Sequence, residues 1–309
     1  TDTLHNRYPD PLQMDVKTII AAQEKITEQQ IFLGNGSDEC IGVLMQTFSI
    51  PGKDKIMVLP PTFAMYEHAA HVSNIEIIEV LLKEETFQLD VPAMLDVIAK
   101  EKNLKLIFIC SPNNPTGNLI SESDIEIILN NFSGLVVIDE AYQDFSSSTS
   151  WTQRLQEFEN LVVINTFSKS WGMANARLGV LYAHKQIIQY MNTIKMPYNV
   201  NQHTIDLALQ ALNRRDIKNN FVQQLVAGRK WLELQMKSIP LIHKVYPSDT
   251  NYILFKVDDA NKLYKYLLTK KVIIRNRDKA PLLKGCLRVS VGTPEENNQF
   301  IEALKSYTE

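Results

Sequence analysis

The feature that most constrains the fold of this chain is a regular alternation of short, β-branched apolar runs with helical patterns between about residues 35 and 212. Such alternation is typical of an α/β sheet that is mostly parallel and has helices on both faces. Several runs are apolar at nearly every position, which favours strands buried on both sides. The predicted strands are Ile56 to Leu59, Ile75 to Leu81, Leu104 to Cys110, Leu135 to Asp139, Leu161 to Thr166 and Leu178 to Ala183. Because ligands of such sheets gather at the carboxyl ends of the strands, the loops that follow these runs are where a site is expected.

The last third of the chain has a different organisation. A long helical pattern runs from about Asp216 to Ser238, ends at Pro240, and is followed by short strands and two more helical patterns. We expect residues 34–212 to form a large domain. Residues 213–309, completed by the N-terminal residues 1–33, are expected to form a smaller α+β domain.

Composition and charge exclude several classes of function. A net charge of −3 over 309 residues shows no basic excess of the kind that nucleic-acid binding requires, so small molecules or other protein subunits are the expected partners. We find no apolar stretch of roughly 18 residues that would predict a membrane span. The three cysteines, in no C-x-x-C spacing, indicate a reduced, cytoplasmic setting. His68 and His71 share a helical face without an evident third ligand, so no metal site is predicted.

One segment carries the strongest chemical signal. Residues 168–175, Ser-Lys-Ser-Trp-Gly-Met-Ala-Asn, and Arg177 follow the predicted strand that ends at Thr166. They place Lys169 where a hydroxyl and an arginine can reach one phosphate, which is the layout of a lysine that binds pyridoxal 5'-phosphate as a Schiff base. An amine attacks an aldehyde only when it is unprotonated, and partial burial beside a cation lowers a lysine pKa toward neutrality.

Three other loops supply complementary parts. The loop 34–39, Gly-Asn-Gly-Ser-Asp-Glu, precedes a helical run and suits a phosphate, although a simple capped helix start explains it equally well. The string 111–117, Ser-Pro-Asn-Asn-Pro-Thr-Gly, leaves Asn114 able to donate a hydrogen bond above a strand end. In the segment 139–142, Asp139 can keep a pyridine nitrogen protonated and Tyr142 can bond the ring oxygen. Asp139 could equally cap the next helix.

In order and content these loops resemble the fold-type-I pyridoxal-phosphate-dependent aminotransferases, and more closely the histidinol-phosphate aminotransferases. The resemblance spans almost the whole chain. Further matches are Asn6 to Pro9, Pro60 to Phe63, Pro197 to Asn199, Thr250 to Tyr252 and Gly285 to Arg288. Phe63 stands where the family commonly has tyrosine.

The resemblance implies a role for each matching residue. Lys169, Asp139 and Tyr142 would be catalytic, with Lys169 also moving the proton at the substrate α-carbon. Tyr8 would reach the cofactor phosphate from a neighbouring subunit, which implies a homodimer with shared active sites. The residues implied to hold the cofactor are Tyr8, Ser37, Asp38, Phe63, Asn114, Asp139, Tyr142, Ser168, Lys169 and Arg177.

The resemblance also implies the substrate. Arg288 would bind an anion in bidentate fashion, and Arg275 matches a second anion-binding arginine, a pair that suits a dianionic phosphate. The expected reaction is transfer of the amino group of L-histidinol phosphate to 2-oxoglutarate, in histidine biosynthesis. An aromatic-amino-acid aminotransferase, a threonine-phosphate decarboxylase of the same fold and a non-catalytic binding protein are the alternatives, because fold alone does not fix reaction type.

Overall fold

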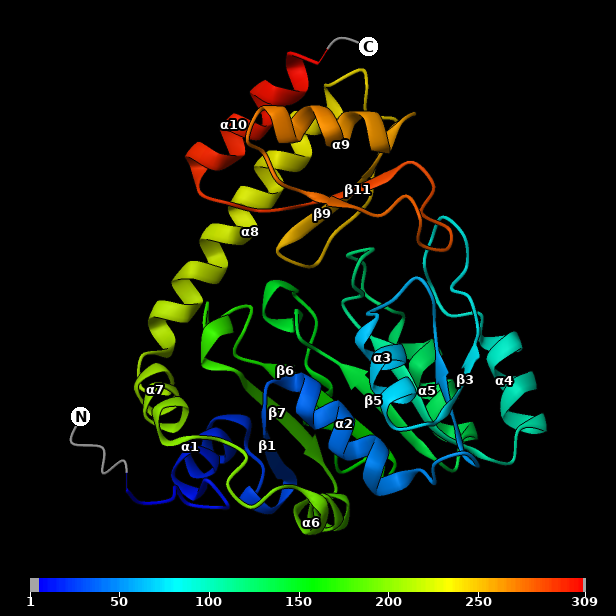
Figure 1. The fold of residues 1–309 in the computed structure, drawn as a ribbon, viewed down its shortest axis with the longest axis vertical. Helices are drawn as coiled ribbons and strands as arrows, with labels where there is room; N and C mark the ends of the chain where they lie inside the picture. The colour runs from blue at the N-terminus through cyan, green and yellow to red at the C-terminus, as the bar shows by residue number, and fades with distance from the viewer. Residues whose placement is uncertain (1–5, 308–309) are drawn as a thin grey trace.

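Two sheets organise the molecule (Figure 1). Within residues 6–307, which the computed structural model describes, seven strands form the larger sheet in the order β1-β7-β6-β5-β4-β2-β3, and four strands form the smaller one in the order β10-β11-β9-β8. The strands of the larger sheet are β1 (Ile31–Asn35), β2 (Lys55–Val58), β3 (Glu76–Glu79), β4 (Leu104–Cys110), β5 (Leu135–Asp139), β6 (Leu161–Thr166) and β7 (Leu178–Ala183). Those of the smaller sheet are β8 (Lys244–Val245), β9 (Tyr252–Lys256), β10 (Arg275–Asn276) and β11 (Cys286–Ser290).

The helices alternate with these strands along the chain. The α-helices are α1 (Met14–Glu24), α2 (Ser37–Phe48), α3 (Met65–Val72), α4 (Val91–Lys100), α5 (Glu122–Asn131), α6 (Lys185–Ile194), α7 (Gln202–Leu212), α8 (Arg215–Lys237), α9 (Ala260–Thr269) and α10 (Pro294–Lys305). Short 3-10 helices are η1 (Glu28–Gln30), η2 (Gln143–Phe145), η3 (Trp151–Arg154) and η4 (Ala174–Ala176). In the described part of the chain no helix is both long and apolar enough to cross a membrane.

The larger sheet is the middle layer of three. Strands β2 to β6 are parallel to one another, whereas β7 runs antiparallel to both β1 and β6. Successive residues of a strand point to opposite faces. In β4, Leu106 and Phe108 join the core under α2, α3 and α6, while Ile107 and Ile109 join the core under α1, α4, α5 and α7. Burial on both faces explains why these strands read as continuous apolar runs.

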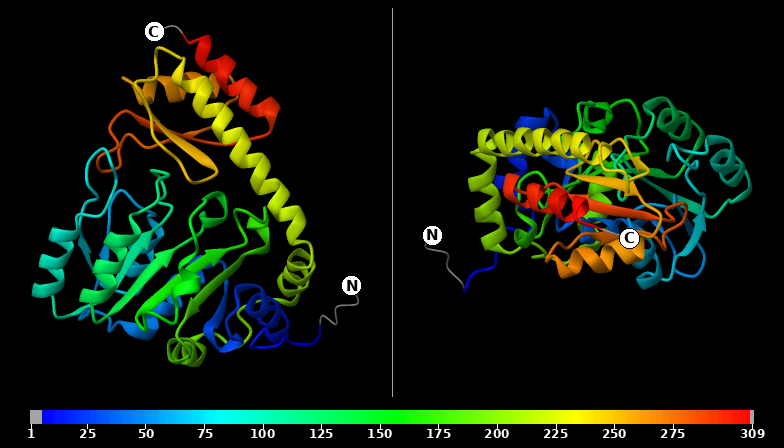
Figure 2. Two further views of the ribbon diagram at one scale, coloured as in Figure 1. Left: turned by 180° about the vertical axis from the view of Figure 1, so that it is seen from behind. Right: turned by 90° about the horizontal axis from the view of Figure 1, so that it is seen from above.

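The smaller sheet has two unlike faces. Ile253, Phe255, Leu287 and Val289 pack against α8, α9 and α10, whereas Leu254 and Cys286 belong to the core of the larger unit. Helix α8 leads from α7 up to the smaller sheet, which lies over the edge of the larger sheet (Figures 1 and 2). The predicted α/β fold, with a mostly parallel sheet and a smaller α+β part, is confirmed.

The N-terminal segment requires a correction. We expected residues 1–33 to complete the smaller domain, and residues 1–5 lie outside the described part of the chain. The remainder belongs with the larger sheet. Ile31 to Asn35 pair with Leu178 to Tyr182 of β7, and α1 packs its buried side chains, Val16 and Ile20, into the core of the larger unit. The physical reason is that the β7 edge offers unpaired backbone groups and an apolar surface that β1 and α1 cover.

Candidate active site

The turn that carries Lys169, here called the lysine turn (residues 167–173), follows β6 directly. The backbone N–H of Met173 donates to the carbonyl of Phe167 at 3.1 Å, and that of Gly172 to the carbonyl of Lys169 at 3.0 Å. Gly172 has φ +65, a left-handed conformation that glycine adopts without strain. The rings of Phe167 and Trp171 stack with centroids 5.0 Å apart. The turn therefore holds Lys169 at the carboxyl end of the sheet.

Lys169 lies in an environment that favours the neutral amine. Its side chain is half-buried, and Nζ is 5.5 Å from the centroid of the Tyr142 ring. Burial lowers the pKa of Lys169, the positive charge of Arg288 lowers it further, and Asp139 acts in the opposite direction. The sequence pointed to Arg177 as the neighbouring cation. Arg177 does contribute, but less than Arg288.

Asp139, the last residue of β5, is a buried acceptor. Its side chain is 2% exposed, and its two oxygens accept from the hydroxyl of Tyr66 at 2.7 Å and from the backbone N–H of Ala141 at 3.0 Å. Burial raises the pKa of Asp139, while the Tyr66 hydrogen bond and Lys169 lower it. A cation placed beside this carboxylate would therefore stabilise its ionised form.

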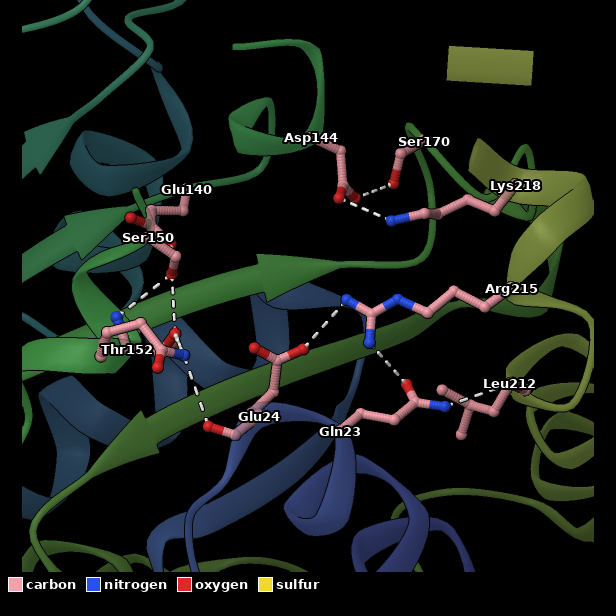
Figure 3. Close-up of polar contacts among 11 residues, drawn as sticks. Gln23, Glu24, Glu140, Asp144, Ser150, Thr152, Ser170, Leu212, Arg215 and Lys218 are labelled. Carbon is pink, nitrogen blue, oxygen red and sulfur yellow. Dashed lines mark hydrogen bonds and ion pairs between the residues drawn. The ribbon is translucent and has the colours of Figure 1, made fainter. Parts of the chain in front are cut away.

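The neighbouring Glu140 points away from Asp139 and serves the fold. Its carboxylate accepts from the backbone N–H of Trp151 at 2.8 Å and from the hydroxyl of Ser150 at 2.5 Å (Figure 3). Burial raises the pKa of Glu140 to about 8. Adjacent residues of a strand face opposite sides, so the acidic pair in the sequence divides into one carboxylate near Lys169 and one that anchors a loop.

Asn114, Tyr142 and Arg288 meet where the two units face each other. The guanidinium of Arg288, on β11, donates to Oδ1 of Asn114 at 2.5 Å and lies 4.5 Å from the centroid of the Tyr252 ring. Tyr142 packs edge-on against Tyr252, whose hydroxyl donates to the carbonyl of Asn113 at 2.7 Å. These contacts join the carboxyl ends of β4 and β5 to the smaller sheet.

A corner suited to a phosphate lies at the start of α2. Gly36, with φ +82, precedes Ser37, the first residue of the helix, and a Cβ on Gly36 would lie 2.4 Å from Nη2 of Arg177. Arg177 pairs with Asp38 at 3.0 Å. Because free N–H groups at a helix start and an adjacent guanidinium suit a dianion, this corner could hold a phosphate. Ser168 lies on the lysine turn, where its backbone N–H donates to the hydroxyl of Thr166 at 3.1 Å.

Three arginines share one face of the smaller sheet. Arg275 lies directly opposite Arg288 in the β10–β11 register, and Arg277 continues that pairing through its N–H to the carbonyl of Cys286 at 3.0 Å. Alternation along the strand places Arg275 and Arg277 on the same side. Among residues 6–307 none of the three forms an ion pair, and the buried Nε atoms of Arg277 and Arg288 have no hydrogen-bond partner. Such a face favours anions.

Two predicted residues stand further out. Phe63 is half-buried and packs edge-on against Tyr66, with centroids 5.6 Å apart, so it borders the Asp139 carboxylate through that tyrosine. Tyr8 lies at the surface of this chain. Its side chain is 80% exposed, and its ring stacks on Tyr198 with centroids 4.3 Å apart.

Sequence reasoning did not assign roles to Tyr66 and Arg277. Tyr66 is three residues after Phe63 at the start of a helical pattern, a spacing that places both on one side. Arg277 is two residues after Arg275, which is the strand period. Both signals were weak, because neither shows which distant segment the side chain will meet.

A cleft of about 1010 Å³ opens beside Lys169. Its walls come from the lysine turn, from α8 and from the start of α10, and include the large apolar side chains of Trp171, Phe221, Leu225 and Trp231. Within the described residues, no group of three or more His, Cys, Asp or Glu side chains could hold a metal ion. Of the predicted site residues, Lys169 alone is among those that line this cleft, so the cleft borders the site from the side of α8.

These residues fit pyridoxal phosphate. An amine with a lowered pKa suits the aldehyde, a buried carboxylate suits the ring nitrogen, and a helix start beside Arg177 suits the phosphate. The fit rests on complementary chemistry, since the aldehyde, the ring nitrogen and the phosphate of the cofactor each have a protein group that can bind them.

Comparison with known proteins gives the same result. The family model "Aminotransferase class I and II" matches residues 5–304. A histidinol-phosphate aminotransferase of Cytophaga hutchinsonii is 47% identical over 302 residues, which covers 98% of this chain and 86% of that protein.

Solved structures have the same fold. The histidinol-phosphate aminotransferase of Clostridium acetobutylicum superposes with a TM-score of 0.89 at 24% identity and covers 97% of this chain and 90% of that one. The enzyme of the same name from Sinorhizobium meliloti, solved in complex with pyridoxal-5'-phosphate, has a TM-score of 0.88 at 20% identity, with 97% and 82% covered. At these identities the structures establish the fold alone, whereas the family match over nearly the whole sequence shows that this chain belongs to the class I and II aminotransferases.

Proposed function

We propose that this chain transfers the amino group of L-histidinol phosphate to 2-oxoglutarate, giving imidazole acetol phosphate and glutamate. The observation that carries the proposal is a half-buried lysine at the carboxyl end of the sheet, 5.5 Å from the centroid of the Tyr142 ring, whose pKa is lowered by burial and by Arg288. The name of the Cytophaga hutchinsonii relative supports the substrate, because 47% identity extends over 98% of the chain.

Pyridoxal phosphate is the cofactor, and when bound it supplies an aldehyde that takes the amino group and a ring that accepts electrons from the substrate carbon. Lys169 would hold the aldehyde carbon, and Asp139 would keep the ring nitrogen protonated. Asn114 and Tyr142 would bond the ring oxygen, and Phe63 would cover the ring face. The phosphate would be held by Arg177, Ser168 and the N–H groups of Ser37 and Asp38, with Tyr8 of a second subunit.

The chain's own residues perform the proton transfer. The substrate amine would displace Lys169 from the cofactor. The freed, neutral amine of Lys169 would then take the proton from the substrate α-carbon. Its lowered pKa keeps a larger fraction unprotonated near neutral pH than an exposed lysine would have. The buried ring of Tyr142 beside Lys169 limits the water that could compete for that proton on this side of the amine.

The arginine face selects the anionic end of the substrate. Arg275 and Arg288 would bind the phosphate of histidinol phosphate, and the same cations would bind a carboxylate of 2-oxoglutarate in the second half of the reaction. The absence of ion pairs on these arginines in residues 6–307 supports this role, because their charges remain available to a ligand.

We also propose a homodimer with shared active sites in the cytoplasm. The Tyr8 ring supports the shared site, since it is held by Tyr198 on one face and remains exposed enough to contact a second copy. Cys40, Cys110 and Cys286 are buried free thiols, which supports a reducing compartment.

A half-reaction assay tests the substrate. The protein is loaded with pyridoxal phosphate, and its visible absorption is followed after addition of histidinol phosphate or phenylalanine without 2-oxoglutarate. We expect histidinol phosphate to convert the spectrum and phenylalanine to do so at least about tenfold more slowly, because charged hydrogen bonds to the phosphate contribute about 1.5–3 kcal/mol each.

The variant Arg275→Ala provides the control. It should reduce kcat/KM for histidinol phosphate and leave that for phenylalanine nearly unchanged. Conversion by phenylalanine alone would make this an aromatic-amino-acid aminotransferase, and release of carbon dioxide from a phosphorylated amino acid would make it a decarboxylase.

A further inference from the structure

A carboxylate outside the catalytic set contacts the lysine turn. Asp144, in η2, lies five residues after Asp139 on the same segment. Its Oδ2 accepts from the hydroxyl of Ser170, the residue next to Lys169, at 2.5 Å (Figure 3). Ser170 is 4% exposed, so this hydrogen bond is shielded from water. The segment that carries Asp139 therefore also fixes the turn that carries Lys169.

The other oxygen of the same carboxylate binds α8. The ammonium of Lys218, in the first turn of that helix, lies 2.6 Å from Oδ1 of Asp144. The Lys218 side chain is 5% exposed, and its Nζ lies 5.2 Å from the ring centroid of Trp171 in the lysine turn. A buried ammonium that lost this carboxylate would keep an uncompensated charge, which is strongly destabilising. The contact between Lys218 and Asp144 is therefore held in place.

Helix α8 carries the connection to the smaller sheet. Leu232 and Met236, near its other end, belong to the core formed with β9 and β11, and β11 carries Arg288. A rigid helix transmits a displacement of the smaller sheet to its first turn. The network Ser170–Asp144–Lys218 thus joins the amine side of the active site to the element that supports the arginine face.

We propose that Asp144 is a positioning residue for the transamination reaction. Its carboxylate fixes the position of the lysine turn relative to α8, so that Lys169 and the arginine face keep a defined orientation to each other. The activity readout rests on the proposed function. The structural readout does not, since it is made on the protein without cofactor or substrate.

The test compares three variants with a matched control. Asp144→Asn and Lys218→Met break the link to α8, and Ser170→Ala breaks the link to the turn without removing a charge. The control is Arg215→Met. Arg215 lies three residues before Lys218 on the same helix, and its guanidinium donates to Gln23 at 3.1 Å and to Glu24 at 3.4 Å on α1 (Figure 3). This substitution removes a polar contact between α8 and α1 and leaves the contacts of Asp144 in place.

We expect kcat to fall on the order of tenfold to a hundredfold in the three variants, with KM for histidinol phosphate changed by less than about threefold, because a small displacement of a reacting group affects the chemical step more than binding. Amide hydrogen exchange of residues 168–173 should become faster in the cofactor-free variants. Arg215→Met should leave both quantities near wild type.

The proposal is overturned if folded Ser170→Ala keeps wild-type kcat and wild-type exchange in the lysine turn, or if Arg215→Met lowers kcat as much as Asp144→Asn. Ser170→Ala decides the matter if Lys218→Met fails to fold. If wild type leaves histidinol phosphate unchanged, the proposed function is wrong, and the exchange data still decide whether Asp144 holds the turn.

Discussion

Lys169 is surrounded by charges that pull its pKa in opposite directions. Burial and Arg288 favour the neutral amine, whereas Asp139 and Asp38 favour the charged one. The most effective of these charges, Arg288, belongs to the smaller sheet and is also the proposed substrate ligand. Binding of an anion to Arg288 would offset its charge and raise the pKa of the amine at that moment.

The variant Arg288→Met should therefore raise the pKa of Lys169 toward that of an exposed lysine, because a nearby like charge is removed. The pKa is read in the cofactor-free protein from the pH dependence of acylation of Lys169, followed by peptide mass spectrometry. Arg275→Met is the control, since this guanidinium is exposed to solvent and its charge is screened. An equal shift in both variants would contradict the assignment to Arg288.

At the residue scale, the sequence predicted the groups with strong local signatures. Asp139 ends a recognisable strand, Lys169 and Asn114 follow two others within a few residues, and the structure brings all three to the same edge of the sheet. Tyr66 and Arg277 were not predicted as neighbours of the site. Tyr66 bonds to Asp139 of β5, 73 residues later in the sequence, and no local pattern reports such a contact. Arg277 pairs with the nearby Cys286 of β11, but the sequence does not show that this pairing places it beside Arg275 and Arg288.

At the element scale, the close approach of α2 to β7 shapes the phosphate corner. Gly179 of β7 faces the start of α2, and a Cβ there would lie 2.3 Å from the backbone nitrogen of Ser37 and 2.4 Å from the backbone carbon of Gly36. Both neighbours are backbone atoms, so neither can move without displacing the helix. The glycine thus sets how near the free N–H groups come to the lysine turn.

The variant Gly179→Ala should lower the free energy of unfolding by about 1–3 kcal/mol, the usual cost of overpacking. It should also weaken retention of pyridoxal phosphate, measured by dialysis and absorption. Gly42→Ala, in the middle of α2 with nothing within 4 Å of the new Cβ, is the control. It should raise stability by up to about 1 kcal/mol, because alanine is the better helix former. Unchanged cofactor retention in Gly179→Ala would show that the close approach is not required.

The accuracy of the predicted elements depended on how each is stabilised. The strands buried on both faces, β4 to β7, were predicted with their observed bounds, since burial leaves a continuous apolar run. The assignment of residues 1–33 was wrong because β1 pairs with β7, about 150 residues later, and a short apolar run does not identify its partner. In the smaller sheet β10 begins only at Arg275, because the backbone N–H of Val272 donates to the carbonyl of Leu267 in α9.

At the scale of the whole molecule, the site is divided between two units and, as proposed, between two copies of the chain. Lys169 and Asp139 come from the larger sheet, and Arg288 comes from the smaller one. Tyr8 is exposed and stacks on Tyr198 of the larger unit. The shared-site proposal therefore makes a prediction about mixtures of defective subunits.

Mixed dimers of Lys169→Ala with Tyr8→Ala should recover activity. If Tyr8 serves the neighbouring site, random exchange leaves roughly one site in four intact, because half of the dimers are mixed and each has one complete site. The control is a mixture of Lys169→Ala with Asp139→Ala, which lie in one subunit's site and leave none complete. Absence of recovery in the first mixture, with dimers verified by light scattering, would assign Tyr8 to its own subunit.

The two unlike faces of β11 have a consequence for how the substrate range can change. Leu287 and Val289 hold the smaller unit together, while Arg288 between them faces the larger one. A substitution at position 288 therefore changes which anion binds, and it leaves intact the apolar packing that holds the strand in place. Natural or laboratory selection can thus change ligand preference through substitutions at the alternate strand positions that face the larger unit, without compensating substitutions to restore stability.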